Sequence, residues 1–197
     1  FNYAKLAYEL SYNPYDEAIN AFHEFIEKYP SSEDAKEAYE FLLKVYLTTK
    51  NYDDALASME KIQNKDPRMQ RAYQTIVYNR AVEQFHNRDY EKAKESFKLV
   101  SRYPIAQELN AMSEFWIAEC NYKSGAYEEA IVNYEKFRFI NGAMLTDEFS
   151  DLDYHLGYAY FDHANPYNNV KAYEQKTQQE RLRSSIKYFR NHIHQSN

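Results

Sequence analysis

Apolar and polar residues recur along this chain with the spacing of amphipathic helices, and the pattern is interrupted at regular intervals. Over residues 37–49 the apolar positions share one helical face, and after a two-residue break a second such pattern begins at Tyr52. Asp53 and Asp54 follow in its first turn, where the helix dipole favours negative charge. Pro67 ends the segment because a proline cannot continue a helix interior. This unit is therefore predicted to be a helix, a short turn, a second helix and a stop.

The same unit occurs repeatedly at a nearly constant period. A tyrosine opens the second helix of four units and an alanine follows three positions later, in the pairs Tyr15 and Ala18, Tyr52 and Ala55, Tyr90 and Ala93, and Tyr127 and Ala130. Successive alanines lie 37, 38 and 37 residues apart. Two short helices cannot bury their apolar faces alone, so such a period predicts stacked units. We expect these tyrosines and alanines to be structural, because a small side chain lets paired helices approach closely.

Residues 115–130, which read FWIAECNYKSGAYEEA, are the clearest copy, and residues 154–161 open a fifth one. This pattern resembles the tetratricopeptide repeat. The resemblance implies an all-α fold, a right-handed superhelical solenoid of about five antiparallel helix pairs that forms a single domain over residues 1–197. The expected repeats are residues 1–30, 31–67, 68–104, 105–142 and 143–197. Their period of about 37 residues departs from the roughly 34 residues of the family.

Two predicted units end in a Tyr-Pro pair, at Tyr29-Pro30 and Tyr103-Pro104. Long units with this ending resemble the bacterial cell-envelope branch of the family, which includes Tol-Pal-associated periplasmic proteins and outer-membrane assembly lipoproteins. The resemblance implies a periplasmic or outer-membrane-associated protein. Because the chain opens at Phe1, without methionine and inside a helical pattern, we interpret it as a piece of a longer protein.

The fifth unit is irregular. If Ser185 takes the place of the alanine and Phe189 that of the aromatic residue four positions later, a polar insertion lies near residues 162–181. Insertions in repeat arrays form loops and often contribute to a binding face, but a solvated loop or extra helical turns is the preferred interpretation of this one. A second alignment starts the second helix at residues 165–167 but puts Glu174 where an aromatic residue belongs, so the first is preferred.

The first helix of each unit lines the concave face of the superhelix in the family. Carried over position by position, the resemblance implies a partner-binding groove formed by Tyr78, Phe85, Phe115, Glu119, Tyr122, Tyr154, Tyr158 and Phe161, with Asn79 and Lys123 beside it. Aromatic side chains offer a large contact area at a low entropic cost, and tyrosine adds a polar tip. The competing interpretation is that some of these rings only pack against neighbouring helices.

Charge argues against nucleic acid as a partner, because the 197 residues carry a formal net charge of −6. The charge is uneven: residues 1–60 hold 5 basic and 12 acidic groups, whereas residues 61–110 hold 10 and 6. The acidic N-terminal segment would favour a basic partner, but helix surfaces are also charged for solubility alone.

The sequence offers no catalytic or cofactor-binding motif. Three glycines leave no phosphate-binding loop, and a single cysteine, Cys120, excludes a disulfide within the chain. Cys120 falls at a packing position and is interpreted as a small buried hydrophobic residue. His192 and His194 make a poor chelate, since residues two apart on a helix point to different sides. We expect no enzyme activity, no cofactor and no metal.

The preferred hypothesis is a non-catalytic protein-interaction scaffold that holds a partner peptide or helix in the aromatic groove. The alternative is a glycan- or peptidoglycan-binding envelope protein, because tyrosine-rich troughs can stack sugars. No apolar run reaches the roughly 20 residues of a membrane span. The sequence leaves the oligomeric state open.

Overall fold

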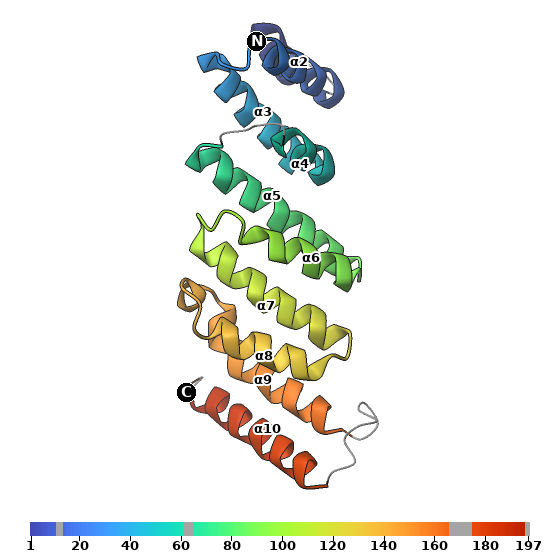
Figure 1. Cartoon of the computed structure of the whole chain (residues 1–197), viewed down its shortest axis with the longest axis vertical. Coiled ribbons are helices and arrows are strands. Elements are labelled where there is room, and N and C mark those ends of the chain that lie inside the picture. The colour runs from blue at the N-terminus through green and yellow to red at the C-terminus, as the bar shows by residue number, and fades with distance from the viewer. Residues whose placement is uncertain (11–13, 61–64, 166–174, 196–197) are drawn as a thin grey trace. The chain divides into compact units, whose positions relative to one another are not determined.

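The computed structural model describes residues 1–10, 14–60, 65–165 and 175–195. Within these ranges the chain is built from α-helices and one short 3-10 helix, with no strand (Figure 1). The helices are α1 (Asn2–Leu10), α2 (Pro14–Lys28), α3 (Glu33–Thr49), α4 (Tyr52–Glu60), α5 (Pro67–His86), α6 (Tyr90–Val100), α7 (Gln107–Lys123), α8 (Tyr127–Phe137), η1 (Ala143–Leu145), α9 (Glu148–Ala164) and α10 (Gln175–Gln195). They pack in adjacent pairs, so the predicted all-α class of helix-pair repeats is confirmed.

The turn inside a helix pair uses a left-handed backbone conformation. Lys50, Arg88 and Gly125 each lie two residues before the tyrosine that opens the second helix, with φ angles of 57°, 65° and 77°. Glycine adopts this conformation without the steric penalty that a Cβ brings. A Cβ built on Gly125 would meet no atom within 4 Å, so its advantage is conformational. These three turns therefore share a backbone shape and not a residue type.

The chain divides into two compact units, Phe1–Ile76 and Val77–Asn197, with the boundary inside α5. In the first unit α2 contacts both α1 and α3, and α3 contacts α4. Phe22 is fully buried there and stacks on Phe41 with 5.4 Å between ring centroids. Ser32 caps α3, because its hydroxyl accepts a hydrogen bond of 3.0 Å from the backbone N–H of Ala35.

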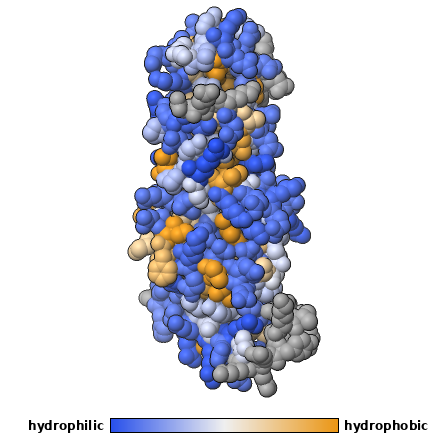
Figure 2. Space-filling model, in the orientation of Figure 1, coloured by the Kyte–Doolittle hydropathy of each residue, from blue (hydrophilic) through white to orange (hydrophobic). Residues whose placement is uncertain are grey.

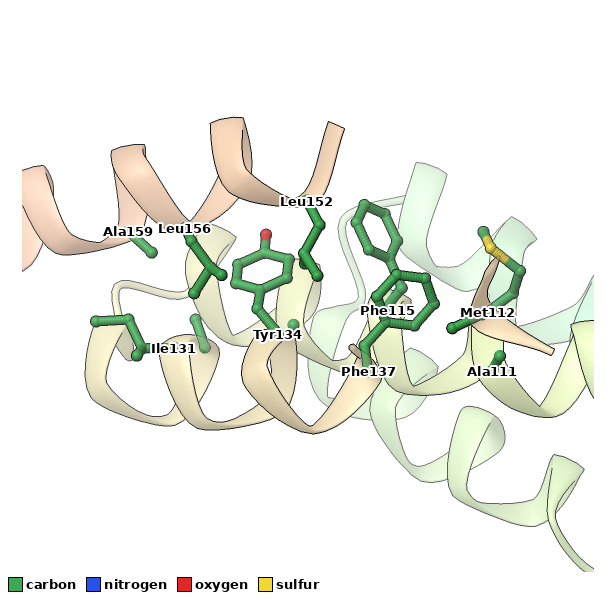
Figure 3. Packing of buried hydrophobic residues seen from close by; sticks show 12 residues of the cluster. Ala111, Met112, Phe115, Ile131, Tyr134, Phe137, Leu152, Leu156 and Ala159 are labelled. Carbon is green, nitrogen blue, oxygen red and sulfur yellow. The ribbon is translucent and has the colours of Figure 1, made fainter. Parts of the chain in front are cut away.

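The second unit contains a core to which four elements contribute. Its buried residues come from α7, α8, η1 and α9: Ala111, Met112, Phe115, Ala118, Ala130, Ile131, Tyr134, Phe137, Ala143, Leu152, Leu156 and Ala159. Figure 3 shows the Tyr134 ring between Leu152 and Leu156, with its hydroxyl directed away from the α8 backbone. A smaller cluster joins α5, α6 and α7 through Ala81, Ala93, Phe97, Ile117 and Cys120.

The repeated alanines all lie in the core. Ala18, Ala55, Ala93 and Ala130 are each fully buried. Of the repeated tyrosines, Tyr52 is buried and Tyr90 and Tyr127 are half-buried, whereas the side chain of Tyr15 lies outside the described part of the structure. The alanine positions are thus places where no larger side chain would fit without displacing a neighbour.

Ser185 occupies the alanine position of the fifth pair. Its side chain is buried and donates a hydrogen bond of 2.9 Å to the carbonyl oxygen of Gly157 on α9. The Phe189 ring covers the same glycine so closely that a Cβ there would lie 2.7 Å from it. Gly157 therefore lets α10 approach α9.

The predicted insertion near residues 162–181 is described only in part. Its end belongs to α10, which begins at Gln175, so extra helical turns account for this portion. Residues 166–174, which include most of the alternative alignment, lie outside the described residues.

The face shown in Figure 2 is largely hydrophilic, and apolar side chains appear on it as separate small groups. Among the described residues, no helix is both long enough and apolar enough to cross a bilayer. The repeat boundaries predicted from the sequence stay predictions.

Replacing Ala93 by leucine tests the close approach of paired helices. Ala93 is fully buried against Phe97, Ile117 and Cys120, so overpacking should cost about 1–3 kcal/mol of unfolding free energy. The matched control is Ala57→Leu, at an exposed position of α4, which should change it by less than about 0.5 kcal/mol. Urea unfolding followed by circular dichroism measures both. Equal stability of the two variants would contradict the structural role of Ala93.

Candidate partner-binding site

The eight residues of the predicted groove all lie in the second unit, on the first helix of three successive pairs. They are Tyr78 and Phe85 on α5, Phe115, Glu119 and Tyr122 on α7, and Tyr154, Tyr158 and Phe161 on α9. Their exposure differs widely, from 3% for Phe115 to 48% for Phe161. The burial of each side chain therefore decides which of them can meet a partner.

Three of the predicted residues make packing contacts. Phe115 is buried among Tyr134, Phe137 and His155 and presents almost no surface. The hydroxyl of Tyr78 accepts a 2.9 Å hydrogen bond from the indole N–H of Trp116.

Phe85 also packs on Trp116, with 4.8 Å between ring centroids. Tyr78 and Phe85 keep part of their surface, since both are half-buried. The competing interpretation, in which rings pack between neighbouring helices, thus describes this end of the predicted groove.

Four other predicted residues come together around one hollow of about 240 Å³. We call it the tyrosine hollow. It lies among α7, α8 and α9 and is lined by Glu119, Tyr122, Lys123, Tyr134, Tyr154, His155 and Tyr158. These four side chains of the predicted groove therefore converge on the hollow.

Glu119 supplies the carboxylate of the hollow and is only 8% exposed. Its Oε1 atom accepts a hydrogen bond from the hydroxyl of Tyr134 and lies 2.8 Å from Nδ1 of His155. Burial by itself would raise the pKa of this carboxyl, but the contacts with His155 and Tyr134 and the nearby charge of Lys123 hold the pKa below its ordinary value. Burial and the same carboxylate raise the pKa of Tyr134. Glu119 is therefore ionised at neutral pH, and Tyr134 carries its proton.

Tyr122 forms one wall and is fixed in place by Asp162. Its hydroxyl donates a hydrogen bond of 2.5 Å to Oδ2 of Asp162 on α9. Burial and this carboxylate raise the pKa of Tyr122. The ammonium of Lys123 lies 5.5 Å from the centroid of the same ring.

Tyr154 and Tyr158 form the exposed rim, and their side chains support each other. They are 43% and 41% exposed, and their rings meet edge to face with 4.8 Å between centroids. Phe189 on α10 packs behind Tyr158 at 5.1 Å, and His192 approaches Tyr154 at 5.6 Å. Phe161 lies further along α9 and does not line the hollow.

Tyr134, His155 and Asp162 were missed by the sequence analysis as members of the site. Tyr134 occupies a position filled by Phe22, Met59 and Phe97 in the other units, so its extra hydroxyl was a usable signal. No sequence pattern indicated that His155 pairs with Glu119 or that Asp162 pairs with Tyr122. These pairs depend on how α7 and α9 lie against each other.

A second hollow of about 250 Å³ lies within the first unit, between α3 and the start of α5. Its apolar lining includes Tyr39, Leu43, Met69 and Ala72. An ion pair of 3.2 Å between Arg68 and Glu40 lies at the same place. No repeat position or motif in the sequence indicates this second hollow.

No cluster suited to a metal ion occurs in the part of the chain that the structure describes, where no group of three or more His, Cys, Asp or Glu side chains is assembled. Cys120 is buried in the smaller core cluster, and burial raises the pKa of its thiol to about 12. It is therefore a protonated packing residue at neutral pH.

Comparison with known families supports the repeat assignment. The tetratricopeptide repeat model matches residues 12–69, which lie in the first unit. No curated protein matches the chain. The match supports a tetratricopeptide repeat protein, in agreement with the helix pairs, and the tyrosine hollow lies outside the matched segment. The bacterial cell-envelope branch stays a prediction.

The lowered pKa of Glu119 predicts a pH-dependent contribution to stability. A carboxyl whose pKa is depressed by folding stabilises the fold above its ordinary pKa, here 4.5. This stabilisation is lost as the pH falls below 4.5 and through the lower pKa of the folded state. The unfolding free energy of the wild type should therefore approach that of Glu119→Gln in this range, as measured by urea unfolding at a series of pH values. A difference between them that is independent of pH would show that the carboxylate charge contributes nothing.

Proposed function

We propose that this chain is a non-catalytic scaffold that holds a segment of a protein partner against α7 and α9. Tetratricopeptide repeats generally mediate protein–protein interactions, and residues 12–69 match this family. The observation that carries the proposal is the tyrosine hollow, where Glu119, Tyr122, Tyr154 and Tyr158 converge.

An exposed aromatic stripe on α9 supports a docking role. Tyr154, Tyr158 and Phe161 are each more than two-fifths exposed and lie four and three residues apart, which places them along one side of the helix. Leaving several large rings in water is unfavourable, and clustered exposed aromatic residues are typical of interaction sites. An extended peptide or an amphipathic helix matches a stripe of this form.

The rim is also arranged to bind without large rearrangement. Edge-to-face contacts hold Tyr154 against Tyr158, and Phe189 supports Tyr158 from α10. The hydrogen bond to Asp162 fixes Tyr122. Side chains that are already ordered lose less conformational entropy when a partner binds, so this arrangement favours affinity.

The location that we propose is the bacterial periplasm or the inner face of the outer membrane, as part of an envelope assembly. Its support is the resemblance of units ending in Tyr29-Pro30 and Tyr103-Pro104 to the cell-envelope branch. Fractionation of the source cells, with detection of the chain by antibody, tests it. Recovery only in the cytoplasmic fraction would overturn the location without affecting the docking surface.

Site-specific photo-crosslinking tests the docking surface. A photoreactive residue in place of Phe161 should capture one protein reproducibly in the native organism, identified by mass spectrometry. Capture should fall at least tenfold when Tyr154 and Tyr158 are both replaced by alanine, since both side chains are expected to contact the partner.

The matched control is Phe139→Ala, which removes an aromatic side chain that is 81% exposed beyond the end of α8. It should leave capture unchanged. Equal capture by the double variant and the wild type would place the partner elsewhere.

A glycan panel addresses the alternative function, glycan binding, because exposed tyrosine rings also stack sugars. Recovery of cell-wall fragments together with retention on glycans would replace the scaffold proposal with glycan binding.

A further inference from the structure

We propose that the tyrosine hollow recognises an arginine side chain of the bound partner segment. This inference rests on the proposed function and adds the chemistry that the hollow selects. It depends on three features of the described residues. They are a largely buried carboxylate with one oxygen that accepts no hydrogen bond from these residues, aromatic rings that line the hollow, and hydroxyl and carboxylate oxygens around it that can accept hydrogen bonds.

The carboxylate of Glu119 is satisfied on one side only. Tyr134 and His155 both reach Oε1, whereas no hydrogen bond or ion pair from the described residues reaches Oε2. Lys123 also lines the hollow, but its ammonium lies over the Tyr122 ring, and no ion pair joins it to Glu119 among the described residues. Oε2 therefore remains an acceptor without a partner among the described residues, and a cation that enters the hollow would form a charge-assisted hydrogen bond with it.

The walls suit a flat cation. The rings of Tyr122, Tyr154 and Tyr158 line the hollow and keep part of their surface, and the negative face of an aromatic ring attracts a cation. The volume of about 240 Å³ accommodates a planar group together with its aliphatic stem. An anionic side chain would instead meet Glu119 and, beside Tyr122, Asp162.

Arginine fits this arrangement better than lysine. A guanidinium is planar, stacks on aromatic faces and carries five N–H donors in fixed directions. Around the hollow, Oε2 of Glu119 and the hydroxyl oxygen of Tyr122, which donates its own proton to Asp162, are available as acceptors at different positions. A lysine ammonium would satisfy the charge but would leave the ring faces less well covered.

The test uses small peptides and does not require the natural partner. The probes are acetyl-Gly-Arg-Gly-amide and its analogues with citrulline, lysine or glutamate at the central position. Titration of isotope-labelled protein, followed by amide chemical shifts, locates and measures binding. The arginine peptide should shift amides around Glu119, Tyr122 and Tyr158. The neutral but isosteric citrulline peptide should bind at least about tenfold more weakly, since it has lost the charge.

Two variants connect the selectivity to the hollow. Glu119→Gln keeps an oxygen that can accept from Tyr134 and His155 but removes the charge, so arginine and citrulline peptides should bind equally. Its matched control is Glu129→Gln at an exposed position of α8, which should retain the preference. If Glu119→Gln does not fold, Tyr158→Leu at the exposed rim should weaken arginine binding at least about fivefold while the melting temperature is kept.

The outcomes separate this inference from the proposed function. Equal binding of arginine and citrulline peptides, or shifts outside the hollow, would overturn arginine recognition. Arginine recognition would also be overturned if crosslinking at Phe161 captured a partner and Glu119→Gln did not reduce that capture. The scaffold function would stand in that case. Absence of any crosslinked partner would instead remove the scaffold function on which the inference rests.

Discussion

The close approach of two helices at a small residue is the constraint on which the rest of this structure depends. Each pair needs a position where the second helix has a small side chain at its contact with the first helix. The fully buried alanines at this position are Ala18, Ala55, Ala93 and Ala130. In the fifth pair the small residue lies on the first helix, α9, where Gly157 leaves room for the Phe189 ring of α10. Ser185 can then occupy the alanine position because its hydroxyl donates to the carbonyl of that glycine. The polar atom is satisfied, so burying it costs little.

The candidate site depends on the same packing. Because α8 lies close to both α7 and α9, the Tyr134 ring fills the core while its hydroxyl reaches Glu119 (Figure 3). One side chain therefore contributes both to the core and to the polar floor of the hollow. The floor is anionic because hydrogen bonds offset the desolvation of the Glu119 carboxylate. The rim tyrosines remain exposed above it, supported from α10.

Much of the fold followed from periodicity. The recurring Tyr-Ala spacing and the proline stops predicted all-α helix pairs, and the structure has them. The left-handed turns were visible only at Gly125, because Lys50 and Arg88 adopt the same conformation without a residue that signals it. Sequence position did not predict which aromatic rings of the expected concave face are exposed. Tyr78 and Phe85 occupy the same helical positions as Tyr154 and Phe161, yet Trp116 covers much of the first two rings.

The sequence by itself determined the repeat unit, the class of fold and the helix faces that carry aromatic residues, because helical periodicity and small-residue spacing are local properties of the chain. Only the tertiary structure decided which of those residues are accessible. It buried Phe115, exposed Tyr154 and Tyr158, and brought His155 and Asp162 to Glu119 and Tyr122. Exposure and pairing depend on side chains about 40 residues away in sequence, one repeat along the chain, and no local pattern records how neighbouring helices meet.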